Sequence, residues 1–134
     1  MIPEDVEALA LGDAVGALEP HEQAELAARL AELTGDGAEA RPAQRGYAQE
    51  SAHAFAPRKR EGVPHLLLAQ AGTGIGKTLG YLAPASLWAE ANAGAVWLST
   101  YTRALQRQIE RESHAVYPDP VIHARKAVVR KGRE

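Results

Sequence analysis

The stretch Leu66–Leu82 reads LLLAQAGTGIGKTLGYL and decides how the rest of the chain is interpreted. It begins in a short aliphatic run, His65–Gln70, which is too short for a typical helix and is typical of a buried parallel strand. Three glycines follow, and Lys77 then opens a run of helix formers that extends to about Ala91, bent or tightened near Pro84. We therefore predict a strand, a glycine-rich loop and a helix in direct succession.

The loop between these two elements has the composition of a phosphate-binding site, a P-loop with a Walker A motif. Glycines let the backbone turn so that its N–H groups face inward, and the helix that follows adds the positive end of its dipole. We predict that Lys77 contacts the β- and γ-phosphates of ATP and that the Thr78 hydroxyl holds Mg²⁺, which makes these two the predicted catalytic residues. The residues predicted to bind ATP in this loop are Ala71, Gly72, Thr73, Gly74, Ile75, Gly76, Lys77 and Thr78.

The first position of the motif is unusual, because Ala71 stands where the common pattern has glycine. The resulting spacing, A-x-x-G-x-G-K-T, is the variant found in helicase-type motors rather than in small nucleotide kinases. The alternative is a glycine-rich turn that matches the motif by chance. A strand before the loop and a helix after it favour nucleotide binding.

The composition indicates a folded protein without a membrane span. The chain has 134 residues, of which 46% are hydrophobic and 24% charged, enough for one domain. It contains no cysteine, which excludes disulfides and thiolate metal sites within this chain. No apolar run reaches the ~20 residues of a membrane span, and no leader precedes a cleavage site. We expect a soluble cytoplasmic protein.

Charge is distributed unevenly along the chain. Residues 1–40 contain ten Asp or Glu and one Arg, whereas residues 41–134 contain fourteen Lys or Arg and seven Asp or Glu. An acidic front and a basic remainder indicate a polyanionic partner for the second part. We therefore divide the chain into an acidic N-terminal segment, 1–40, and a basic domain, 41–134.

The acidic segment is predicted to be helical. Residues 3–34 form two helical pieces, broken near Gly12 to Gly16 and restarted at Pro20, and the second carries leucines at helical spacing. Gly35-Asp36-Gly37 then stops the helix and begins a linker. We expect this segment to pack on the domain surface, and a DNA-mimicking or autoinhibitory role is the alternative.

The basic domain alternates between helical and strand-like segments. We predict a helix from Pro42 to about Ala54, a second buried strand over 95–99, a helix capped by Thr102 and running to about His114, and a third strand over 127–130. Prolines 118 and 120 are expected to end the region after the helix. This order is that of an α/β domain with a parallel sheet flanked by helices.

An Arg-Pro-Ala-Gln element, residues 41–44, lies some thirty residues before the loop. A glutamine amide can give one hydrogen bond and take another, which matches N6 and N7 of adenine. Gln44 is therefore predicted to bind the adenine of ATP. The alternative is an ordinary polar residue in the first turn of a helix.

A second polar element follows the strand predicted over 95–99. Its sequence, STYTRALQRQ, occupies residues 99–108 and combines hydroxyls, a helix N-terminus and an arginine at the carboxyl end of a strand, where ligands bind in open α/β sheets. Such a site suits phosphates, and the pattern resembles helicase motif Ia, which implies that Ser99, Thr100, Thr102 and Arg103 bind the backbone of single-stranded DNA. As structure alone, Thr102 is a helix cap and Leu105 a core contact, and those roles can coexist with DNA binding.

Together these elements resemble the DinG-type ATP-dependent DNA helicases, relatives of the XPD helicase in superfamily 2. The resemblance covers roughly residues 41–134 and is carried by RPAQ, AGTGIGKTLGYLAP, VWLSTYTRALQRQ and VVRKGRE. It implies a RecA-like P-loop NTPase domain, ATP and Mg²⁺ as ligands, single-stranded DNA as partner and a monomeric motor. It also implies a 4Fe-4S cluster in the relatives, whose ligands are absent from this chain; the chain stops at Glu134, just past the Lys-Gly-Arg element that precedes the first of them. Many relatives have glutamate where Gln70 stands here.

The resemblance covers only part of a motor. No aliphatic run ending in Asp-Glu is present, and the acids after the second predicted strand, Glu110, Glu112, Asp119 and Glu134, do not follow such a run. We expect the chain alone to bind ATP weakly and not to unwind DNA, and a full-length protein to couple hydrolysis to unwinding. Two alternatives stay open: a truncated paralogue that binds nucleotide or DNA without turnover, and a P-loop phosphotransferase, which would have no use for the STYTR element.

Overall fold

A computed structural model of the chain describes residues 6–11, 18–35, 41–58 and 60–132. These residues divide into two compact units, one within 1–96 and the other within 97–134. The helix break predicted near Gly12 to Gly16, the Asp36-Gly37 part of the predicted linker, and Arg133 and Glu134 lie outside the described residues. The boundary predicted at residue 40 stays a prediction.

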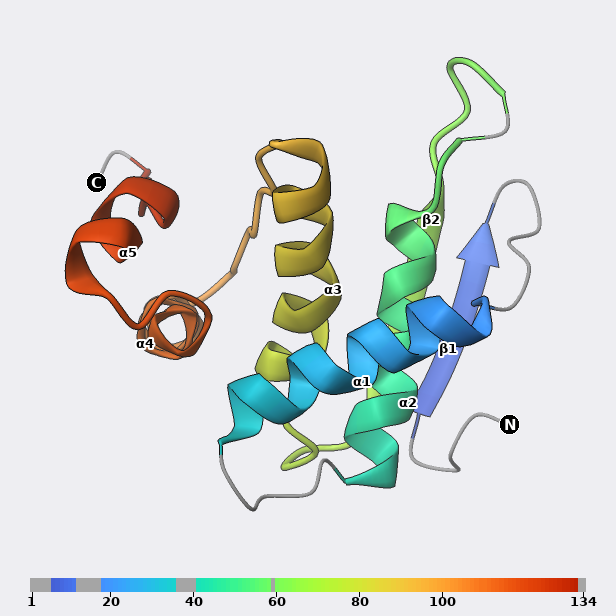
Figure 1. Cartoon of the computed structure of the whole chain (residues 1–134), viewed down its shortest axis with the longest axis horizontal. Helices are drawn as coiled ribbons and strands as arrows, with labels where there is room; N and C mark the ends of the chain where they lie inside the picture. Colours follow the sequence, from blue (N-terminus) through green and yellow to red (C-terminus); the bar gives the residue numbers. More distant parts are fainter. Residues whose placement is uncertain (1–5, 12–17, 36–40, 59, 133–134) are drawn as a thin grey trace. The chain divides into compact units, whose positions relative to one another are not determined.

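The first unit contains a two-stranded antiparallel sheet, of which β1 (Val6–Leu11) is the blue arrow in Figure 1. Strand β1 pairs with β2 (Leu66–Ala71), with Val6 opposite Ala71 and Leu11 opposite Leu66. The prediction of a helix over residues 6–11 is therefore wrong. Alanine, leucine and glutamate favour helix locally, but a six-residue segment is too short for a stable helix, whereas the edge of β2 offers a full ladder of hydrogen bonds.

Helix α1 (Pro20–Thr34) confirms the second helical piece predicted for the acidic segment. It starts with a capping box, in which the Glu22 carboxylate accepts a hydrogen bond of 2.8 Å from the Glu19 backbone N–H, and ends at Gly35 with φ of 92°. Its buried side chains are Leu26, Leu30 and Leu33. Their spacing places them on one face of the helix, which packs against the rest of the unit.

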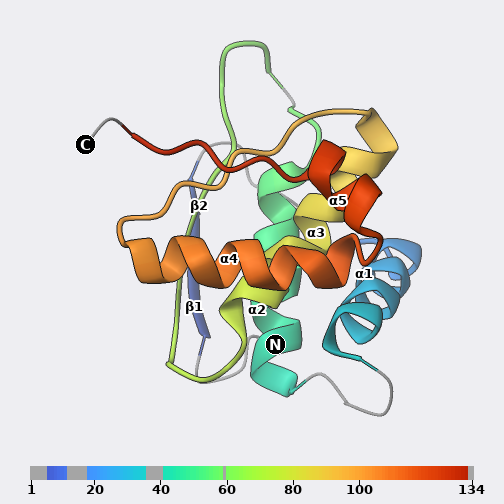
Figure 2. The same cartoon turned by 90° about the vertical axis from the view of Figure 1, so that its left-hand side faces the viewer.

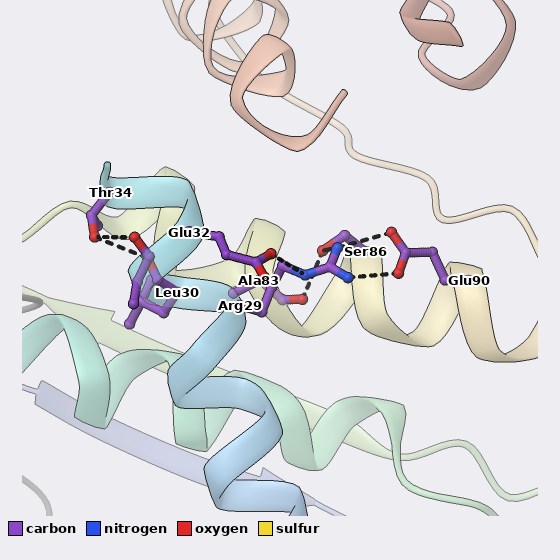
Figure 3. Close-up of polar contacts among 8 residues, drawn as sticks. Arg29, Leu30, Glu32, Thr34, Ala83, Ser86 and Glu90 are labelled. Carbon is purple, nitrogen blue, oxygen red and sulfur yellow. Dashed lines mark hydrogen bonds and ion pairs between the residues drawn. The ribbon is translucent and has the colours of Figure 1, made fainter. Parts of the chain in front are cut away.

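Arg29 fixes α1 to helix α3 (Lys77–Asn92), as Figure 3 shows. Its guanidinium donates to both carboxylate oxygens of Glu90, over 2.9 and 2.6 Å, and to the Ser86 hydroxyl over 3.2 Å. Glu32 on α1 lies 3.5 Å from the same guanidinium. The single arginine of the acidic segment is thus used to hold α1 in place, by the bidentate geometry that arginine favours.

Helix α2 (Pro42–Ala52) contacts both the sheet and α3, and a short 3₁₀ helix, η1 (His53–Phe55), extends it. The helix predicted from Pro42 is confirmed, and so is the helix predicted to begin at Lys77. Pro84 lies inside α3 and is buried, and the helix continues past it. The contacts of α2 on both sides place the loop between β2 and α3 close to the first turn of α2.

The described part of the second unit contains two helices, of which α4 (Arg103–Val116) is seen along its length in Figure 2. The Thr102 hydroxyl accepts a hydrogen bond of 3.2 Å from the Leu105 N–H, which confirms the predicted cap. Helix α5 (Pro120–Lys126) was not predicted. Asp119 caps it by accepting from the N–H groups of Val121 and Ile122, and Pro120 occupies the first turn, where proline is favoured.

The sheet differs from the one expected from the sequence. Among the described residues, 95–99 and 127–130 form no strand, because a strand requires a hydrogen-bonded neighbour that these segments lack. Strand β2 is confirmed, but it is not buried on both faces: Leu66 and Leu68 are 50% and 55% exposed. The parallel sheet of a P-loop NTPase stays a prediction. Among the described helices, none has the length and apolar character to cross a membrane.

Candidate functional site

The glycine-rich loop connects β2 to α3 and is described throughout. Gly74 and Gly76 have positive φ angles of 80° and 83°, and Gly76 is the N-cap of α3 in the left-handed conformation. Ile75, between them, is 8% exposed and packs in a cluster with Val6 and Ala71. The buried isoleucine anchors the loop while the glycines on both sides of it stay exposed. Left-handed turns before a helix N-terminus are the backbone shape that gathers N–H groups for an anion.

Lys77 is the first residue of α3, and its side chain turns back along the loop. Its ammonium donates a hydrogen bond of 3.1 Å to the carbonyl oxygen of Ala71, the residue at which the loop begins. The positive charge is therefore held at the loop rather than directed away from it. Thr78, the predicted Mg²⁺ ligand, is in the first turn of α3 and is 7% exposed. The structure thus brings together the predicted residues of the loop.

Gln44, predicted to bind adenine, lies against the same loop. Its side-chain amide donates to the carbonyl oxygen of Gly76 over 3.0 Å, and the residue is 6% exposed. A Cβ atom added at Gly76 would stand 2.2 Å from Gln44 Nε2, so the glycine permits this approach. One of the two amide hydrogens of Gln44 is therefore used to bind the protein itself. Adenine recognition by this residue stays a prediction.

Arg41 also contacts the loop, a role that was not predicted. Its guanidinium donates from Nη1 to the carbonyl oxygen of Gly74. Arg41 is the N-cap of α2 and precedes Gln44 by three positions in the Arg-Pro-Ala-Gln element. The element places both residues at the start of the helix, but the contact of Arg41 with Gly74 depends on how α2 packs beside the loop.

Tyr47, one turn beyond Gln44, packs under the start of α3. A Cβ atom at Gly80 would lie 2.8 Å from the Tyr47 ring, so the absence of a side chain there lets α2 and α3 approach closely. Burial raises the pKa of the Tyr47 phenol, and a hydrogen bond with the Ser51 side chain lowers it in part. The phenol is therefore neutral at physiological pH and serves as a packing group between the two helices.

The residues predicted to bind DNA lie in the second unit, before and at the start of α4. Ser99, Thr102 and Arg103 are exposed, and Thr100 is half-buried. The Thr100 hydroxyl donates to the Thr102 carbonyl over 3.4 Å, which orders the turn before the helix. Tyr101 between them is fully exposed. The four residues are thus brought together on a capped helix start.

A basic run follows α4 and reaches the end of the described residues. It comprises Arg125, Lys126, Arg130 and Lys131, all of which are exposed. An exposed basic run can bind a polyanion or can be an ordinary solvated edge. The exposure of all four side chains is compatible with both.

Curated relatives are similar to most of this chain. A stretch of 97 residues, 72% of the chain, is 38% identical to the 3'-5' exonuclease DinG of Bacillus subtilis (strain 168). A stretch of 73 residues, 54% of the chain, is 45% identical to the ATP-dependent helicase DinG of Mycobacterium tuberculosis (strain ATCC 25177 / H37Ra), and the same values hold for its namesake in Mycobacterium bovis. The chain spans about a tenth of the length of these relatives, since each match covers 10% of the relative.

Comparisons with protein-family models and with solved structures found no similar protein. No protein-family model matches the chain, and no solved structure matches it significantly. The similarity to proteins named DinG confirms the resemblance derived from the RPAQ element and the glycine-rich loop. Over the part of its sequence that it shares with them, the chain is similar to proteins named DinG.

Proposed function

We propose that the loop over residues 71–78 binds the triphosphate of ATP together with Mg²⁺. The observation that carries this proposal is the conformation of the loop. Two glycines with positive φ lead into the N-terminus of α3, and the Lys77 ammonium is held against the loop. A phosphate chain in this loop would accept hydrogen bonds from exposed backbone N–H groups and would be stabilised by the helix dipole.

Lys77 has one role in this proposal, the neutralisation of phosphate charge. In the structure its ammonium donates to the Ala71 carbonyl, a neutral acceptor. A phosphate oxygen carries a negative charge and is the stronger acceptor, so the ammonium would exchange the carbonyl for the phosphate. The side chain is exposed and needs only rotamer changes to do this. The carbonyl contact therefore keeps the charge near the loop before nucleotide binds.

The donor set of the loop fits a magnesium ion that is bound mainly through phosphate. Mg²⁺ prefers oxygen ligands and keeps several waters, so a single hydroxyl, that of Thr78, is enough when phosphate oxygens supply the rest. Among the described residues, no three His, Cys, Asp or Glu side chains are grouped as a metal site. An iron–sulfur cluster does not fit this chain, which has no cysteine.

We further propose that the whole protein is an ATP-dependent DNA helicase and that residues 99–103 contact single-stranded DNA. Two relatives bear the helicase name and a third the exonuclease name. The helicase name is the one that agrees with the triphosphate binding proposed for the glycine-rich loop of this chain. The competing function is a nucleotide- or DNA-binding protein without turnover. ATP hydrolysis stimulated by single-stranded DNA in the whole protein would decide for the helicase.

The two binding sites can be tested in the chain itself by amide NMR. We expect Mg-ATP to shift the amides of residues 72–78, and a single-stranded oligothymidylate to shift those of residues 99–105. The oligonucleotide shifts should decrease as salt rises, since phosphate contacts release counterions. Arg103→Ala should reduce them, whereas Arg111→Ala, at another exposed arginine of α4, should not. ATP that shifts no loop amide, or equal effects of the two arginine variants, would contradict the corresponding site.

A further inference from the structure

Two side chains at the start of α2, those of its N-cap Arg41 and of Gln44 in its first turn, hold the glycine-rich loop by its carbonyl groups. Arg41 donates to the oxygen of Gly74, and Gln44 donates to the oxygen of Gly76. The two acceptors belong to the two loop residues with positive φ angles. The start of α2 therefore forms a hydrogen bond with the loop at each of the two left-handed residues, Gly74 and Gly76.

A hydrogen bond to a carbonyl oxygen also orients the N–H group of the same peptide unit. A trans peptide is planar, with its C=O and N–H pointing in opposite directions, and the described residues contain no cis peptide. The oxygen of Gly74 shares a peptide plane with the N–H of Ile75, and the oxygen of Gly76 shares one with the N–H of Lys77. Holding the oxygens on the side of α2 thus turns these two N–H groups to the opposite side, where an anion could accept from them.

The hydrogen bonds of Arg41 and Gln44 are not equally important for the orientation of the loop peptides. The Gly76 oxygen also accepts a hydrogen bond of 3.0 Å from the Gly80 N–H in the first turn of α3, so the helix itself orients that peptide. Gly74 lies before the helix, where intrahelical hydrogen bonds have not begun. The orientation of the Gly74–Ile75 peptide therefore depends on Arg41 to a greater extent than that of the Gly76–Lys77 peptide depends on Gln44.

We propose that Arg41 is a positioning residue of the phosphate-binding loop, which orients the Ile75 amide toward the triphosphate by holding the Gly74 carbonyl. This proposal rests on the proposed ATP-binding function. It also defines the class of ligand affected: every ligand with a triphosphate depends on Arg41, whatever its base. A residue that recognises adenine would instead affect ATP and leave other triphosphates unchanged.

The experiment compares Arg41, the N-cap of α2, with Arg45, which lies within α2. Arg41→Met removes the donor to Gly74. Arg45→Met removes an equal charge from an exposed position within α2, the residue directly after Gln44. The affinity of each variant is measured for Mg-ATP, Mg-GTP and Mg-tripolyphosphate. We expect Arg41→Met to weaken the binding of all three by about tenfold, as for the loss of one charged hydrogen bond, and Arg45→Met to change them by less than about twofold.

A second measurement follows the loop without ligand. Arg41→Met should shift the Ile75 amide resonance in the free protein, and Arg41→Lys, which keeps a charged donor, should restore part of both the resonance and the affinity. The positioning role would be overturned if Arg41→Met weakened the binding of Mg-ATP but not of Mg-GTP and Mg-tripolyphosphate. Equal effects of the Arg41 and Arg45 variants would also overturn it. If the unmodified chain binds none of the three ligands, the proposed function fails, a result distinct from binding that is insensitive to Arg41.

Discussion

Gly74 and Gly76 share a positive φ angle but differ in their surroundings. Nothing lies within 4 Å of a Cβ atom added at Gly74, whereas one added at Gly76 would meet Gln44 Nε2 at 2.2 Å. A side chain at either position would make the left-handed conformation less favourable by about 1–2 kcal/mol. At Gly76 it also displaces the Gln44 amide from its acceptor. The two glycines are therefore needed for different reasons, backbone conformation at one and close approach of α2 at the other.

This difference predicts unequal losses of stability. Gly74→Ala should lower the free energy of unfolding by about 1–2 kcal/mol, the cost of the left-handed conformation. Gly76→Ala should cost about 1–3 kcal/mol more, because the Gln44 hydrogen bond is also lost. Chemical denaturation measures both. Gly72→Ala is the control, since its φ is not positive and the space around it is open. Equal losses at Gly74 and Gly76 would contradict the close contact with Gln44.

At the scale of elements, α4 and α5 are joined by a small polar cluster. The rings of His114 and His123 stack with centroids 3.7 Å apart, and His123 Nε2 lies 2.7 Å from the Ser113 hydroxyl. That hydroxyl donates to the Glu110 carbonyl over 2.6 Å, so His123 is the donor in its contact with Ser113. Burial lowers the pKa of His123 from its ordinary 6.5, the charge of His114 lowers it further, and Glu110 acts in the opposite direction.

The lowered pKa makes the attachment of α5 dependent on pH. The folded state favours neutral His123, so its contribution to stability is complete above the ordinary pKa of 6.5 and is lost as the pH falls through the lower folded value. We expect hydrogen exchange in α5 to accelerate as the pH falls below 6.5, after correction for the intrinsic rate. NMR titration of the ring should show a rise of the His123 pKa in His114→Gln. An unchanged His123 pKa in that variant would contradict the cluster.

Elements with local signals could be predicted from the sequence. Helices α2 and α3 begin where a proline and a glycine loop indicate, and Thr102 caps α4 as its position suggests. Helix α5 has equally local signals, Asp119 and Pro120, but a proline is also common where a helical region ends, which is the role predicted for it here. Strand β1 could not be predicted in this way, because its conformation depends on pairing with β2, some sixty residues later.

The same distinction applies to the site. The loop, Lys77 and Thr78 are contiguous, so their spacing alone indicates phosphate binding. The contact of Arg41 with Gly74 joins residues 33 positions apart and arises only when α2 packs beside the loop. Gln44 was singled out for its chemistry, but its contact with Gly76, 32 positions away, depends on the same packing. Tertiary contacts of this kind leave no periodic trace in the sequence.

At the scale of the whole molecule, the two units differ in how much they bury. The first has an apolar core that includes Leu30, 1% exposed, and Ala83, fully buried. Of the described residues in the second, Ser113 is the buried one, while Trp97 and Val121 are 81% and 63% exposed. The loop proposed to bind ATP thus belongs to the unit with a core, which can hold its backbone in one conformation.

The affinity of the chain for Mg-ATP tests the central claim most directly. The measurement compares the unmodified chain with Lys77→Ala and with Lys126→Ala, which removes an exposed lysine of α5. We predict weak but measurable binding, reduced at least about tenfold by Lys77→Ala, as expected for a charged hydrogen bond to phosphate, and unchanged by Lys126→Ala. Binding that is the same in all three proteins would contradict a triphosphate site at this loop.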